Sequence, residues 1–208
     1  LARRTLGGWD TAFLAAIVYV TTPEVAHWSR GVHLETLVTA WILVGLLAAA
    51  LSIREPSAVL WLAVAAVGGW FAKGPQGLFP VAVALVVWLR AGVLLRRVFS
   101  AWSVAGAVLA LATVGPWLAA RLDERSGFAR AYFAGQIGQV LFETVLDRGP
   151  LWYFNKLLRT YWPWLPVALV GVGLMVREWR RSDGARLWLV YGAIVLIVIS
   201  AAAGKKSR

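Results

Sequence analysis

The stretch Trp70–Pro80 (WFAKGPQGLFP) contains the most promising reactive side chain of this sequence, the amine of Lys73. Lys73 is the only charge in a long apolar region. An unpaired ammonium group in hydrocarbon is costly, so this lysine must reach an interface, a water-filled cavity or an anionic partner. Gly74, Pro75 and Gly77 should end the helix and expose backbone groups to a bound anion. The alternative is a lysine that snorkels from a turn between two membrane helices.

Other isolated charges stand at the predicted membrane boundaries. Glu35 begins an apolar run, although a carboxylate there also suits the helix dipole and needs no function. Arg30 lies upstream of it, and Lys205 and Lys206 follow the last apolar run, where they could simply end a helix at the interface. Together with Lys73, these residues would form a basic, partly lipid-facing cleft that suits a lipid-linked phosphate.

Composition indicates a membrane protein. Of 208 residues, 60% are hydrophobic and 13 are Trp, and the mean hydropathy is +0.70. A net charge of +11 would suggest nucleic-acid binding in a soluble protein. Here the basic residues separate apolar runs, so membrane lipids are the expected partners and nucleic acid is not. The absence of cysteine excludes disulfides and thiolate metal sites.

The apolar runs predict an all-α, polytopic membrane protein with about six to seven transmembrane helices. The segments are Thr11–Pro23, Leu34–Ile53, Ser57–Ala72, Pro75–Leu89, Val98–Ala120, Thr160–Val176 and Leu187–Ala203. Every second connection between these runs is a short loop rich in arginine, and the connections between them carry the isolated charges described above. The positive-inside rule predicts that the arginine-rich loops are cytoplasmic. Within the loop at about 121–160, apolar residues at helical spacing predict an external juxtamembrane amphipathic helix.

Four stretches carry a resemblance to a known superfamily. The sequence resembles the GT-C membrane glycosyltransferases, which include protein O-mannosyltransferases and lipid A aminoarabinose transferases. The similar stretches are TTPEVAHWSRGVHLETL (Thr21–Leu37), AKGPQGLFP (Ala72–Pro80), GPWLAAR (Gly115–Arg121) with RGPLWYF (Arg148–Phe154) and WPWLP (Trp162–Pro166), and SAAAGKKSR (Ser200–Arg208). Their order and spacing cover nearly the whole chain.

The resemblance implies an enzyme that moves a sugar from a polyprenyl-phosphate donor to a lipid, glycan or protein acceptor. It places such an enzyme in the bacterial inner membrane, with its active site on the external, periplasmic face. Glu35 would take the position of an acidic catalytic residue. Lys73, Lys205 and Lys206 would face the donor phosphate, with Arg30 as a further candidate.

Two departures from the family pattern matter. The family's principal catalytic aspartate lies in a loop upstream of residues 1–208, so we expect a partial GT-C domain that is inactive by itself. The resemblance leaves a divalent metal ion open as a cofactor. Gln136, Ile137 and Val140 replace the residues of the aminoarabinose branch, which argues against a metal site like that one.

Two other classes of function remain open at the level of sequence. In a transporter with a basic substrate path, the route would be marked by intramembrane charges and by helices that Gly and Pro interrupt. In a non-catalytic membrane scaffold, the isolated charges would be incidental.

Overall fold

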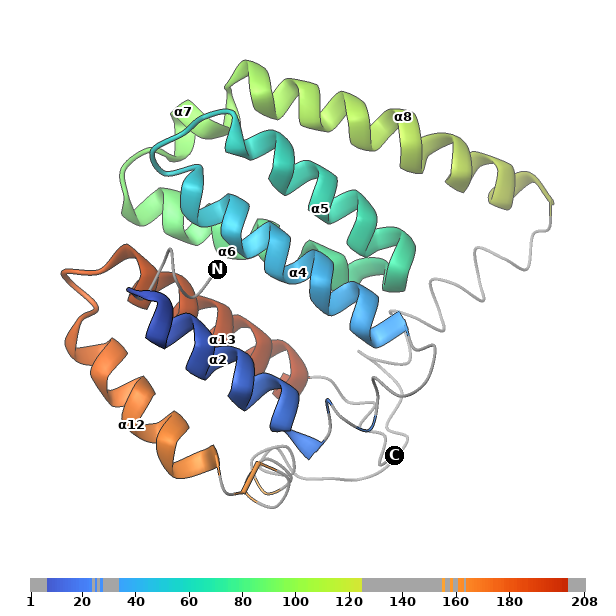
Figure 1. The fold of residues 1–208 in the computed structure, drawn as a ribbon. Coiled ribbons are helices and arrows are strands. Elements are labelled where there is room, and N and C mark those ends of the chain that lie inside the picture. The colour runs from blue at the N-terminus through green and yellow to red at the C-terminus, as the bar shows by residue number, and fades with distance from the viewer. Residues whose placement is uncertain are drawn as a thin grey trace.

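The computed structural model describes residues 7–23, 25, 27, 34–124, 155, 158, 161–162 and 164–201. The regular structure in this part of the chain is helical, without a strand, which confirms the all-α class. The long helices are α2 (Trp9–Thr21), α4 (Leu34–Leu51), α5 (Ala58–Lys73), α6 (Phe79–Arg90), α8 (Ala101–Glu124), α12 (Trp164–Arg177) and α13 (Asp183–Ala201) (Figure 1). Two short elements were not expected, the 3-10 helix η1 (Gly74–Leu78) and helix α7 (Leu94–Val98).

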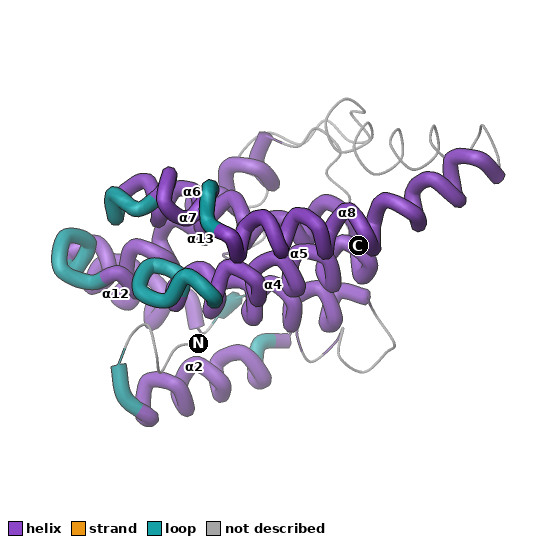
Figure 2. Tube along the Cα trace, turned by 90° about the horizontal axis from the view of Figure 1, so that it is seen from above, coloured by secondary structure: helices purple, strands orange, loops and turns teal. Residues whose placement is uncertain are grey.

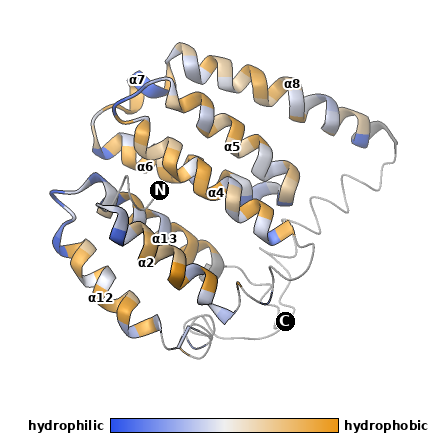
Figure 3. Ribbon diagram, viewed as in Figure 1, coloured by the Kyte–Doolittle hydropathy of each residue, from blue (hydrophilic) through white to orange (hydrophobic). Residues whose placement is uncertain are grey.

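Successive long helices run in alternating directions (Figure 1). The α4–α5, α6–α7 and α12–α13 connections therefore gather at one end, which we call the basic end because Arg54, Arg96, Arg97, Arg180 and Arg181 lie in or beside them. Figure 3 shows hydrophilic colouring on these connections. Element η1 lies at the opposite end, beside the start of α4, and we call this the turn end. Among the described residues, the arginine-rich connections and the turn that carries Lys73 thus lie at opposite ends of the helices.

Within the described ranges, three helical segments are long and apolar enough to cross a membrane: Leu34–Leu51, Ala58–Arg90 and Ala101–Arg121. The second comprises α5, η1 and α6, because helical structure continues through the turn between them. Helices α2 and α12 are apolar but shorter. A membrane location is consistent with these lengths, whereas the expected six to seven spans are not confirmed.

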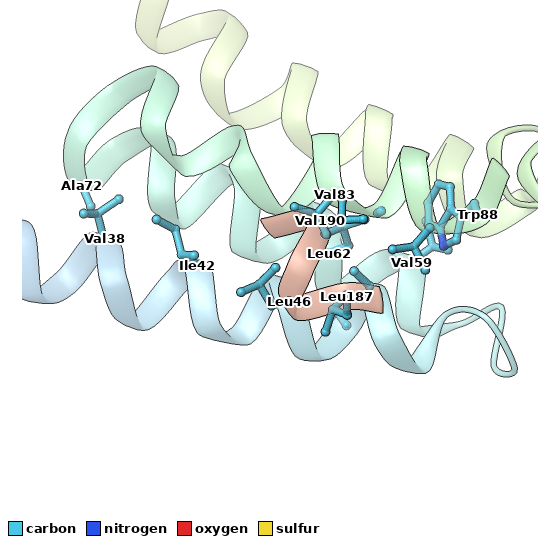
Figure 4. Packing of buried hydrophobic residues seen from close by; sticks show 14 residues of the cluster. Val38, Ile42, Leu46, Val59, Leu62, Ala72, Val83, Trp88, Leu187 and Val190 are labelled. Atoms are coloured by element: carbon cyan, nitrogen blue, oxygen red, sulfur yellow. The ribbon is translucent and has the colours of Figure 1, made fainter. Parts of the chain in front are cut away.

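The core lies where α4, α5, α6 and α13 meet (Figure 4). Leu46, Val83 and Leu187 are fully enclosed there. Small residues allow close approach of the helices. A Cβ atom added at Gly45 would lie 2.6 Å from the Pro80 side chain. Small residues at such crossings are typical of helix packing in membranes, where dispersion replaces the hydrophobic effect as the driving force.

The outer helices expose mainly apolar surface. Helix α8 packs on α5, where Phe71 and Trp117 meet edge to face with ring centroids 5.7 Å apart. Helices α2 and α12 contain no buried residue, and Figure 2 shows α2 set apart on one side of the other helices. Large exposed apolar faces of this kind suit contact with lipid chains better than contact with water.

Candidate functional site

An ion pair joins the two residues that the sequence placed at the centre of the site. Lys73 Nζ donates a hydrogen bond of 2.7 Å to Glu35 Oε1. The two side chains remain 31% and 39% exposed, respectively. Of the three environments predicted for Lys73, the structure therefore provides an anionic partner. A lysine that only snorkels to the interface would not need this carboxylate.

The antiparallel arrangement of α4 and α5 brings the two charges together. Glu35 lies in the first turn of α4, and Lys73 is the last residue of α5. The N-terminus of one helix is therefore beside the C-terminus of the next. Each charge also has the sign that its own helix dipole favours at that position. The backbone carbonyl of Glu35 accepts a 2.7 Å hydrogen bond from the Thr39 hydroxyl, which adds a local contact in the same turn.

Backbone-to-backbone packing fixes the turn that carries Lys73. Gly74 has a φ of +69°, in the region that glycine tolerates far better than other residues. Gly77 then folds against α5 so closely that an added Cβ atom would lie 2.3 Å from the carbonyl carbon of Gly69. Only glycine allows this approach, so the turn has little freedom to shift. Lys73 is consequently held at a defined position relative to α4.

The same packing corrects one expectation. Gly74 and Gly77 are buried, and so their backbone groups are not open to a bound anion. The glycines serve helix packing, because η1 lies directly against the last turns of α5. An anion at this turn must therefore be bound through side chains. Lys73 provides the cationic side chain of the turn.

Several predicted site residues lie outside the described part of the chain. These are Arg30, Lys205 and Lys206, together with most of the expected external helix at about 121–160. Residues 121–124 are described, and they continue α8 instead of beginning a loop. Among the described residues, no group of three His, Cys, Asp or Glu side chains could hold a metal ion.

Sequence reasoning missed a second polar cluster, at the basic end. The Ser52 hydroxyl donates to the carbonyl of Ala49 at 2.8 Å and accepts from Trp88 Nε1 at 2.7 Å. Arg97 donates from Nε to the carbonyl of Ser52 at 2.6 Å and from Nη2 to the carbonyl of Ile53 at 2.9 Å. We call Ser52, Trp88 and Arg97 the basic-end lock. Arg97 belongs to α7 and thus ties that short helix to the carbonyls at the end of α4, which have no partner within the helix.

No protein-family model, curated protein sequence or solved structure matches this chain.

The pair of Glu35 and Lys73 combines two complementary chemical properties. A carboxylate can orient or deprotonate a hydroxyl group, and an ammonium group can stabilise a developing negative charge. Lysine has three N–H donors, and the bond to Glu35 uses one of them. Because both side chains are partly exposed, an incoming anion can approach Lys73 without unfolding the turn.

Proposed function

We propose that this chain is the membrane part of a glycosyltransferase. It would move a sugar from a polyprenyl-phosphate donor to a lipid, glycan or protein acceptor. The proposal rests on the 2.7 Å pair between Glu35 and Lys73 at the turn end of the helix bundle. The GT-C resemblance had selected the same two residues separately, as an acidic residue and a phosphate contact. Their meeting in space supports a shared site.

In the proposed reaction, the oxygen of the acceptor hydroxyl attacks the anomeric carbon of the donor sugar. The bond from that carbon to the phosphate oxygen breaks, and the lipid phosphate leaves with the electron pair. Lys73 binds the phosphate and stabilises the charge that develops on it. Glu35 orients the acceptor hydroxyl and accepts its proton. A further carboxylate upstream of residue 1, as the resemblance implies, would share this second task.

The ion pair also gives these steps an order. Before the donor arrives, Lys73 holds the Glu35 carboxylate. A donor phosphate competes for the ammonium group, because charge-assisted bonds to phosphate are strong. As Lys73 turns toward the phosphate, its bond to Glu35 breaks, and the carboxylate accepts a hydrogen bond from the acceptor hydroxyl in its place. Binding of the donor phosphate to Lys73 would therefore come before proton transfer to Glu35.

The proposed location is a bacterial inner membrane, crossed six to seven times, with the site on the external face. Support comes from the separation of the two ends. The arginine-rich connections lie at the basic end, which the positive-inside rule would place in the cytoplasm. The turn end, with Glu35 and Lys73, then faces outward. Arg30, Lys205 and Lys206 stay proposed as additional phosphate contacts there.

The position of the pair favours the transferase over the transporter. Glu35 and Lys73 lie at helix ends, in the first turn of α4 and the last turn of α5. A transporter would more typically carry its substrate charges near the middle of the membrane, between broken helices.

Transfer of a radiolabelled sugar from polyprenyl phosphate tests the proposal. The whole protein should be assayed in its native membranes, with Lys73→Ala and Glu35→Gln compared at matched expression. Each variant should lose about 100-fold or more in transfer rate, since single general bases and charge-stabilising groups contribute that much.

Two substitutions at the basic end provide matched controls. Arg54 and Glu55 are neighbouring exposed residues with the same types of charge. Arg54→Gln and Glu55→Gln should leave transfer near the wild-type rate. If the wild type transfers sugar and the variants at Lys73 and Glu35 transfer equally well, neither residue belongs to the site. If the wild type transfers no sugar from any polyprenyl-phosphate donor, the function is wrong.

A further inference from the structure

A pocket of about 800 Å³ lies between the end of α12 and the first half of α13, at the basic end. Its polar side includes Arg177, Arg180 and Arg181. Its apolar wall includes Val176 and Leu189. The pocket is far along the helices from the pair of Glu35 and Lys73, since it borders the opposite ends of the bundle. The proposed transfer reaction does not use it.

The charge in this pocket is not neutralised by the described residues. None of the described acidic side chains forms an ion pair with Arg177, Arg180 or Arg181. One acid, Glu178, also lines the pocket, and it leaves an excess of two positive charges when the three arginines are counted against it. Guanidinium groups bind phosphate oxygens through two parallel N–H bonds. The polar side of the pocket is therefore suited to a phosphate group.

The apolar wall continues toward the part of the molecule that suits lipid contact. Val176 is 59% exposed, and Val172 and Leu169, four and seven residues earlier on the same face of α12, are 44% and 61% exposed. All three belong to a helix without buried residues. A molecule with a phosphate among the arginines could therefore lay a hydrocarbon chain along this face. A soluble phosphate would leave the apolar wall unused.

The indole ring that lines the pocket is partly buried and packs against the helical core. Trp179 lines the pocket, and the Arg90 guanidinium lies 5.8 Å from the centre of its ring. Tryptophan is favoured at the level of lipid headgroups, where one side of the ring is apolar and the other is wet. Trp179 thus marks the depth at which a headgroup would lie. The positive-inside rule explains why arginines occur in this loop, but it does not explain why they line a pocket.

The geometry points to a binding site for an anionic phospholipid, with its phosphodiester among Arg177, Arg180 and Arg181 and an acyl chain against Val176 and Leu189. Such a lipid would fasten α12 to α13. Those two helices share few contacts in the structure, and α12 buries no residue of its own.

Binding of fluorescent phosphatidylglycerol to the whole protein in neutral detergent micelles tests this inference. The pocket variant is Arg180→Gln with Arg181→Gln. Its control is Arg54→Gln with Arg96→Gln, which removes two exposed arginines from the same end outside the pocket. The pocket variant should weaken binding by about tenfold or more, because each lost charge-assisted bond to the phosphate costs roughly a factor of ten. The control should change binding little.

Equal losses in both variants would contradict the proposed lipid site, since general surface charge would then explain the binding.

A second variant separates a lipid from a soluble anion. Ala193 lines the pocket and is exposed, so Ala193→Phe should fill the apolar part without disturbing the core. This variant should reduce binding of phosphatidylglycerol while the arginines remain. Inorganic phosphate at the same concentration should not displace the lipid. Full displacement by phosphate, or unchanged lipid binding in Ala193→Phe, would show that the pocket does not hold an acyl chain.

Discussion

The two ends of the α4–α5–α6 bundle hold polar groups in opposite ways. At the basic end, Ser52 is fully buried and bonded on both sides, and Arg97 directs its donors into backbone carbonyls. At the turn end, Glu35 and Lys73 hold each other and stay about one-third exposed. The polar groups of the basic end therefore serve to hold the helices together, whereas the charged groups of the turn end can exchange one partner for another. This difference locates the candidate site.

The largest expected effect tests whether the turn end has a rigid frame. Gly77→Ala should lower the free energy of unfolding by about 3 kcal/mol, because the new Cβ would meet backbone atoms that cannot move aside. Thermal unfolding in detergent micelles measures this change. Gly171→Ala is the matched control, since a Cβ there has open space around it. Equal stability of the two variants would mean that the close contact between Gly69 and Gly77 does not hold the turn.

The basic-end lock should respond more weakly but still clearly. Ser52→Ala should cost about 2 kcal/mol of unfolding free energy, because it leaves the buried Trp88 N–H without its acceptor. Adding Trp88→Phe removes that orphaned group, so the double variant should be more stable than the sum of the two single changes. Simple additivity would show that the hydrogen bond contributes nothing. Transfer per folded molecule should stay unchanged in Ser52→Ala.

Breaking the pair at the turn end should affect stability least among these changes. Glu35→Gln and Lys73→Met should each cost about 1 kcal/mol or less in unfolding free energy, because a partly exposed ion pair contributes little. The same variants should lose most of their transfer activity. A stability loss as large as that of Ser52→Ala would instead place the pair with the structural contacts.

Much of the fold could be predicted from sequence because the relevant signals are local. The apolar run Leu34–Ile53 became α4 at Leu34–Leu51, since length and hydropathy alone define such a helix. The break after Lys73 followed from Gly74, which has the φ that only glycine adopts easily. The length of the spans was less predictable. The sequence suggested two separate segments, Ser57–Ala72 and Pro75–Leu89, whereas η1 joins α5 and α6 in one helical run, Ala58–Arg90.

The candidate site was predicted in part. Glu35 and Lys73 were selected, and a signal for their contact was present, since consecutive antiparallel helices bring the start of one beside the end of the next. Which residues meet depends on the rotation of α4 against α5, and contacts such as Gly68 on the Trp41 ring determine this rotation. No local pattern reports it. The basic-end lock was missed for the same reason, because Ser52 after a helix is an ordinary residue in the sequence.

The most direct test of the central claim exchanges the two charges. Lys73→Glu alone should destabilise the turn end, because it brings two carboxylates together. Adding Glu35→Lys should restore the ion pair and most of the lost stability, with the unfolding temperature slightly below that of the wild type because each charge then opposes its helix dipole. We predict that sugar transfer from polyprenyl phosphate stays lost in this double variant, because the phosphate-binding and proton-accepting groups have exchanged places, and displacements of about 1 Å can cost 100-fold. Recovery of transfer together with stability would contradict the account and leave the pair with a structural role alone.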